Sequence, residues 1–170
     1  VYNGSAGTIK ITGGTIEQKG TGHTITNSTT GTLEVTGGTI TSAGNSGIIN
    51  SSTGTIKVTG SSAKVTGSAF GVDARKGTAI ITAGTVSATT GTAVRVSGTF
   101  EITGGTVSTT GAMGVYCNGS SASVSGSSTK IQKSGTSGGS CFQYNGPGTA
   151  TISGGTISVG TDSGSNAVYN

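Results

Sequence analysis

Few residues of this chain could carry out chemistry. Its 170 residues include five acidic side chains and one histidine. The acidic residues are Glu17, Glu34, Asp73, Glu101 and Asp162. General acid–base catalysis requires a proton donor or acceptor within hydrogen-bonding reach of the reacting group. No two of these carboxylates occupy neighbouring outward positions on one predicted strand, and His23 has no acidic partner in its own strand.

Motifs for cofactors, metals and nucleophiles are absent from the sequence as well. We find no metal-ligand spacing, phosphate-binding loop or nucleophile signature, and no helical pattern follows any of the Gly-x-Gly strings. The sequence therefore predicts a protein that is not an enzyme. We expect no catalytic residue, no bound metal and no cofactor.

The two cysteines, Cys117 and Cys141, lie about one repeat apart. Alignment of the repeats places Cys117 opposite Tyr144 and Cys141 opposite Gly114, on opposite faces of the strand, which disfavours a disulfide. A bulge in the longer repeat that ends near Cys141 would shift this register. A Cys117–Cys141 disulfide therefore stays an alternative to two free thiols.

Charge and hydrophobicity argue against a nucleic-acid partner and against a membrane-spanning helix. The formal net charge is +4, from nine Lys and Arg against five Asp and Glu. The basic residues are scattered, whereas a nucleic-acid-binding protein concentrates them on one face or among aromatic residues. No apolar run approaches the ~20 residues of a membrane-spanning helix. We expect neither a nucleic-acid partner nor a membrane span.

A repeat dominates the sequence. The chain contains 34 Gly, one Pro and no Trp, and it is rich in Thr and Ser, a composition that disfavours helices. A Gly-Thr unit followed by alternating apolar residues begins at Gly7, Gly31, Gly54, Gly77, Gly98, Ser120 and Gly148. Flexible Gly/Ser linkers have no reason to keep such a period, so we interpret the chain as a structural repeat.

Each unit contains three short stretches with the period of two that is typical of β-strands. Apolar residues recur at the same place in every unit, and one such column is Ile11, Val35, Val58, Ile81, Ile102, Val124 and Ile152. A unit this small cannot bury its apolar face alone, but stacked units can. We therefore predict an all-β fold, a right-handed parallel β-helix (β-solenoid) of about seven coils of roughly 23 residues with three strands each. The general preference of parallel crossovers gives the handedness.

We expect residues 1–170 to form a single solenoid domain that is a slice of a longer repeat protein. The chain begins and ends with Val-Tyr-Asn in the slot of the third strand. Neither end carries the amphipathic cap that usually protects the open edges of a solenoid. End-to-end self-association is therefore a further expectation.

Asparagines recur at the corner after the third strand. They are Asn3, Asn27, Asn50, Asn118, Asn145 and Asn170. We predict a structural ladder, in which stacked amides bind one another and the corner backbone. Four of them (Asn3, Asn27, Asn50 and Asn118) also stand in N-x-Ser/Thr triplets, so N-glycosylation is the alternative.

The predicted outward positions suggest two kinds of contact. Tyr2, Tyr116, Gln143 and Tyr169 are candidates for glycan contact, because exposed Tyr beside polar groups can stack on sugar rings. Ranked threonines, as in Thr85-x-Ser87 and Thr106-x-Ser108, resemble the flat faces of ice-binding solenoids. Lys64, Lys130 and Glu17 interrupt these ranks. Asp73 and Arg95 fall in one outward column and are expected to pair.

The repeated G-T-[apolar]-x-[apolar]-T-G-G-T unit is also familiar from other proteins. Together with the stretches ITNSTTG at 25–31 and IINSSTG at 48–54, it resembles the Gly/Thr-rich repeat regions of large bacterial cell-surface, adhesin-like proteins. The resemblance implies a right-handed parallel β-helix of the pectin-lyase-like kind and an extracellular or cell-surface location. Some similar proteins are carbohydrate-binding and use calcium, but they carry more acidic residues than this chain.

The sequence thus predicts a non-enzymatic segment of a secreted or surface-anchored protein that acts as a stiff stalk or fibre. A carbohydrate-binding module that recognises polysaccharides or host glycans is the alternative function. Ice binding through ranked Thr is a second alternative.

Overall fold

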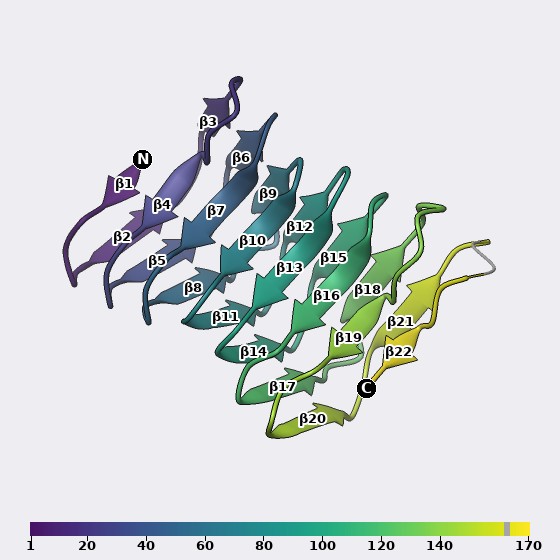
Figure 1. Ribbon diagram of the computed structural model, residues 1–170. Coiled ribbons are helices and arrows are strands. Elements are labelled where there is room, and N and C mark those ends of the chain that lie inside the picture. The colour runs from purple at the N-terminus through teal and green to yellow at the C-terminus, as the bar shows by residue number, and fades with distance from the viewer. Residues whose placement is uncertain (162–163) are drawn as a thin grey trace.

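The computed structural model describes residues 1–161 and 164–170, and every regular element in this part of the chain is a β-strand. The strands form three parallel sheets that run side by side along the molecule (Figure 1). Sheet A contains β1 (Tyr2–Asn3), β4 (Ile25–Asn27), β7 (Ser46–Asn50), β10 (Phe70–Ala74), β13 (Thr92–Val96), β16 (Met113–Cys117), β19 (Phe142–Tyr144) and β22 (Val168–Tyr169).

Sheets B and C have seven strands each. Sheet B contains β2 (Thr8–Ile11), β5 (Thr32–Val35), β8 (Thr55–Val58), β11 (Thr78–Ile81), β14 (Thr99–Ile102), β17 (Ser121–Val124) and β20 (Thr149–Ile152). Sheet C contains β3 (Thr15–Gln18), β6 (Thr39–Ser42), β9 (Lys64–Gly67), β12 (Thr85–Ala88), β15 (Thr106–Thr109), β18 (Lys130–Lys133) and β21 (Thr156–Val159).

The chain visits the sheets in the order B, C, A in every coil, so the neighbours within a sheet come from successive coils. Partners in register are between 21 residues apart, as in Ala79 and Phe100, and 28 apart, as in Ala122 and Ala150. This confirms the predicted parallel β-solenoid of about seven coils. The described residues include no helix able to cross a membrane.

Alternation along each strand builds the core. In β14, Phe100 and Ile102 are fully buried, whereas Thr99 and Glu101 lie on the outer side. The apolar columns predicted from the sequence are in register in all three sheets, as in Val86, Val107 and Ile131 of sheet C. The ring of Phe100 also lies near that of Phe142, with 6.5 Å between centroids. The core is thus continuous from coil to coil.

Tight corners allow the coils to stack closely. At the corner between β5 and β6, Gly38 has a φ of +85°, a conformation that other residues rarely adopt. A Cβ atom there would lie 2.7 Å from the backbone of Gly13 and Gly14 in the previous coil. The second Gly of this Gly-Gly pair is therefore required both by its backbone conformation and by its contact with the neighbouring coil.

Replacement of Ile102 with Ala should lower the free energy of unfolding by about 2–5 kcal/mol, because it leaves a cavity among side chains that both flanking coils hold in place. Glu101→Ala, one residue earlier on the same strand, is the matched control and should change the stability by less than about 0.5 kcal/mol. Urea denaturation followed by circular dichroism measures both variants. Equal losses in the two variants would contradict the inward assignment of Ile102.

Candidate functional site

The outer face of sheet A differs chemically from the outer faces of sheets B and C. Sheets B and C present mainly Thr and Ser with interspersed Lys and Glu. One outward column of sheet A instead contains, in register, Tyr2, Thr26, Ile49, Asp73, Arg95, Tyr116, Gln143 and Tyr169. Carboxylate, guanidinium, phenol and amide groups thus lie on successive strands, which makes this face the candidate functional site.

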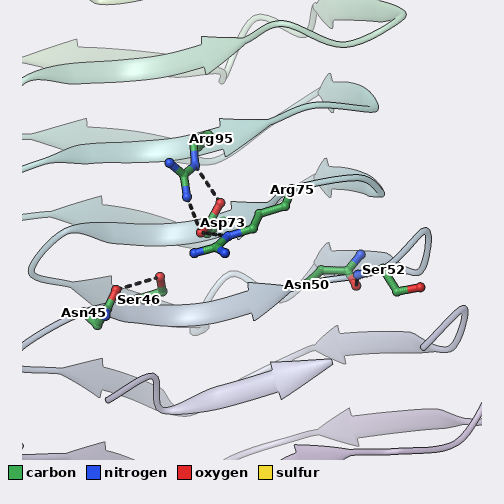
Figure 2. A network of polar contacts seen from close by, with 7 residues as sticks. All are labelled: Asn45, Ser46, Asn50, Ser52, Asp73, Arg75 and Arg95. Carbon is green, nitrogen blue, oxygen red and sulfur yellow. Dashed lines mark hydrogen bonds and ion pairs between the residues drawn. The ribbon is translucent and has the colours of Figure 1, made fainter. Parts of the chain in front are cut away.

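Asp73 is the centre of the site. Its carboxylate is fully buried, although it stands on the outer side of β10. Arg95, the register partner of Asp73 on β13, donates from Nε to Oδ1 at 2.8 Å and from Nη2 to Oδ2 at 2.6 Å. Arg75 donates from Nε to Oδ2 at 3.2 Å. Figure 2 shows the two guanidinium groups meeting at this one carboxylate.

Arg95 has a second contact that fixes its position. Its guanidinium carbon lies 4.0 Å from the centroid of the Phe70 ring, a cation–π arrangement. Asp73 and Phe70 both lie on β10, so together they hold the guanidinium on the outer face and turned toward β10. Tyr116 is the register partner of Arg95 on the other neighbouring strand, β16. The predicted pairing of Asp73 with Arg95 is therefore confirmed.

Sequence reasoning missed Arg75, Phe70 and the neighbourhood of His23. The period of two along a strand places residues 73 and 75 on one side, so Arg75 could have been found from its spacing. His23 comes from a different coil, and its link to this cluster depends on the stacking. Burial lowers the pKa of His23, Arg75 lowers it further and Asp73 opposes the shift. Its Nδ1 is buried and has no hydrogen-bond partner among the described residues.

The candidate glycan-contact residues lie at two separate places on sheet A. Tyr116, Gln143 and Tyr169 lie on adjacent strands β16, β19 and β22, so they form one continuous strip with Arg95. Gln143 donates from Nε2 to Asn145 Oδ1 at 3.3 Å. Tyr2 lies on β1, at the opposite end of the sheet, and belongs to no contact surface with the other three.

The asparagine ladder is shorter than predicted. Asn3, Asn27 and Asn50 form it: the Nδ2 of Asn3 donates to Asn27 Oδ1 at 2.9 Å, and the Nδ2 of Asn27 donates to Asn50 Oδ1 at 3.2 Å. All three are buried. The next residues in register are Ala74, Val96, Cys117 and Tyr144, which end the ladder.

The assignment of Asn118, Asn145 and Asn170 to the ladder was wrong. Asn118 and Asn145 each follow the ladder position by one residue, and both are exposed. Asn170 is exposed beyond β22, where the preceding coil offers Tyr144 rather than an asparagine. The signal was present in the sequence: Asn50 is two residues after the core residue Ile48, whereas Asn118 is three after Val115.

Both cysteines are free and buried, so the alternative of a Cys117–Cys141 disulfide was wrong. The register places Cys117 beside Tyr144, as predicted. The Cys141 thiol donates to the carbonyl of Ile131 at 3.2 Å. Burial raises the pKa of Cys141 to about 11, against smaller opposing effects that include nearby Lys133. Burial raises the pKa of Cys117 as well.

The remaining predicted features are spread over the other faces. Lys10 and Glu34 pair on sheet B at 3.4 Å, with both side chains partly exposed. On sheet C the register places Lys64 between Thr39 and Thr85, which interrupts the ranked hydroxyls. Asp162 lies outside the described residues. No pocket and no cluster of three His, Cys, Asp or Glu suited to a metal ion occurs in the described part of the chain.

A scan against protein-family models, a search of curated proteins and a search of solved structures found no match to this chain. The parallel β-solenoid is therefore established by the geometry of the chain itself, whereas membership of an adhesin-like family stays a prediction.

Asn27→Ala should destabilise the protein by about 1–3 kcal/mol, because it leaves the buried amide groups of its neighbours without partners. Asn27 also donates to the carbonyl of Gly31 at 2.9 Å, and this buried acceptor would lose its donor. Asn118→Ala is the matched control, since this exposed asparagine should be replaceable within about 0.5 kcal/mol. Thermal and urea unfolding measure both variants, and a larger effect at Asn118 would refute the register given above.

Neither cysteine should react with iodoacetamide in the native protein at pH 8. Thiolate is the reactive form, and a pKa of about 11 leaves about one Cys141 thiol in a thousand ionised at that pH. After unfolding in guanidinium chloride, both should be alkylated, which intact-mass measurement detects. Rapid alkylation of the native protein would contradict the burial of the thiols.

Proposed function

We propose that this chain is a non-enzymatic, rigid structural segment of a secreted or cell-surface protein. The observation that carries the proposal is the continuity of the molecule along its axis: three parallel sheets and one aliphatic core pass through all the coils. Backbone hydrogen bonds between successive coils run along the same direction. A segment built in this way is stiff along its axis and holds its two ends at a fixed separation, which is what a stalk requires.

The location and the adhesin-like context belong to the same proposal. The Gly/Thr-rich repeat supports them, because its units resemble those of bacterial surface proteins. The scarcity of exposed large apolar side chains away from the two ends also fits a surface in contact with water: those described are Val1, Tyr2, Ile152, Val168 and Tyr169. End-to-end association stays a prediction.

Carbohydrate binding by the outer face of sheet A is the second candidate function. The observation that favours it is the strip Arg95, Tyr116, Gln143 and Tyr169, in which each residue is in register with the next. Tyr116 and Tyr169 are two strand spacings apart, or about 9.6 Å along the axis. Two aromatic rings at this separation, with an amide between them, suit successive sugar rings of an extended chain. Ice binding has less support, since lysines break the ranks on sheet C.

A rigid segment should resist proteases until it unfolds as a whole. Trypsin has nine Lys and Arg sites in the sequence, yet cleavage inside the coils should follow the global unfolding transition, because ordered strands do not fit a protease site. Limited proteolysis at increasing temperature, compared with the circular dichroism melting curve, measures this. The destabilised Ile102→Ala variant is the control and should be cleaved at a correspondingly lower temperature. Cleavage between coils far below the melting temperature would contradict rigidity.

If the strip binds glycans, affinity electrophoresis against plant, mucin and microbial polysaccharides should show selective retardation by at least one polymer. Tyr116→Ala and Tyr169→Ala should weaken it by about 2- to 10-fold, the loss expected for one aromatic contact. Tyr2→Ala removes a more exposed tyrosine at the far end of the same column and should leave the retardation unchanged. No retardation by any polymer would rule out this second function and leave the structural segment.

A further inference from the structure

We propose that Arg75, Asp73 and Arg95 form an anion-binding site that selects glycan chains carrying a carboxylate or sulfate group beside the sugar ring held by Tyr116. This inference rests on the second candidate function, carbohydrate binding by sheet A, and adds the chemical class of the ligand.

Arg75 and Arg95 are the only two arginines of the chain. Both reach the same carboxylate, although they come from different coils. Arginine presents a planar fork of donors that matches carboxylate and sulfate geometry, which lysine does not. The remaining basic residues are lysines. The structure brings both guanidinium groups to one carboxylate on an otherwise Thr- and Ser-rich surface.

The site keeps an excess of positive charge. Asp73 neutralises one guanidinium group, and no other acidic side chain of the described residues is paired with either arginine. Lys76, next to Arg75, is exposed as well. A fully buried carboxylate beneath two partly exposed guanidinium groups leaves the outer side of the cluster cationic.

Both guanidinium groups retain donors that face solvent. The side chains of Arg75 and Arg95 are 52% and 32% exposed. Arg75 uses only its Nε on Asp73, and Arg95 uses Nε and Nη2. Their other N–H groups have no acceptor among the described residues of the protein, so they are available to an external anion.

Arg95 is also held in place before any ligand arrives. Asp73 binds it in a bidentate manner, and the Phe70 ring lies against it. A side chain that is already ordered loses little conformational freedom on binding, which favours affinity. Asp73 thus acts as a positioning residue. It orients the Arg95 guanidinium group through Nε and Nη2 and leaves the other N–H groups for a ligand.

The cluster adjoins the glycan strip. Arg95 and Tyr116 are register partners on β13 and β16, so their backbones are about 4.8 Å apart. The guanidinium of Arg95 is turned from β13 toward β10. A glycan chain that continues from Tyr116 across β13 would therefore bring an acidic group of its next ring toward Arg95 and Arg75. Gln143 and Tyr169 extend the same strip away from the arginines.

The test compares polymers that share a backbone and differ in charge. Polygalacturonate and its methyl ester form one pair, and heparin and desulfated heparin form the other. The full chain should be retarded more strongly by the charged member of at least one pair, and rising salt should reduce that difference because exposed charges are screened. The pair that shows the difference distinguishes carboxylate from sulfate.

Arg75→Gln should weaken binding to the charged polymer by about 3- to 10-fold, while binding to its uncharged counterpart stays unchanged. Arg95→Lys keeps the charge but removes the fork, and should also reduce the preference. Lys57→Gln, which removes the same charge from sheet B, is the matched control and should leave the preference unchanged. Melting curves of all variants verify that they fold.

The outcomes separate this site from the glycan strip. Equal retardation by the charged and uncharged members of both pairs would overturn the anion site while leaving the strip in place. A charged preference that Lys57→Gln weakens as much as Arg75→Gln would show general charge attraction and overturn it too. Equal retardation by polyglutamate, which has no sugar ring, would overturn the selection of acidic glycans.

Discussion

Backbone pairing between equivalent strands of successive coils is the interaction on which the rest of this structure depends. Each strand binds the strand that occupies the same place one coil earlier, so the side chains of every coil fall into columns. Coil length varies from 21 to 28 residues, yet the register holds in all three sheets because the additional residues lie between strands. The 28-residue spacing, for example, spans the long connection from β18 to β19. The columns therefore tolerate irregular corners, but they do not tolerate a shifted strand.

The position that ends each strand of sheet A shows how this stacking handles buried polar groups. Asn27 and Asn50 donate to the carbonyl four residues later, at Gly31 and Gly54. In a later coil the register places Tyr144 at this point, and its hydroxyl donates to the buried carbonyl of Gly119, the corner glycine of the preceding coil, at 3.2 Å. The chemical requirement at the corner is thus the same, a partner for buried backbone, whereas the side chain that meets it changes from an amide to a phenol.

Stacking also places charge where a single coil could not. A carboxylate as deeply buried as Asp73 is stable only with close cationic partners, and one of these, Arg95, comes from the next coil. This arrangement fixes the register of β10 against β13 and leaves guanidinium donors on the outer face. A structural ion pair and a surface able to bind an anion are therefore compatible uses of the same residues. The proposed rigid segment and the proposed glycan-binding face are compatible in the same way, since a stiff solenoid would keep the strip straight.

The sequence by itself determined the parallel β-solenoid, its coil length and its apolar columns. The spacing of apolar residues along the chain shows both the period of two and the repeat of about 23 residues. Only stacked coils bury such columns. It also indicated that Asp73 and Arg95 share a column and that Cys117 faces Tyr144. The spacing from the core residue of each strand also determined which residue occupies the corner position, because the core register and not the identity of the side chain sets the phase. Asn118 is one residue beyond that position and therefore lies outside the ladder. Spacing along the strand also puts Arg75 on the same side as Asp73. Only the tertiary structure decided that Phe70 lies against Arg95 and that His23 of another coil is near this cluster, since contacts between coils depend on how side chains fill the outer face rather than on spacing along one strand.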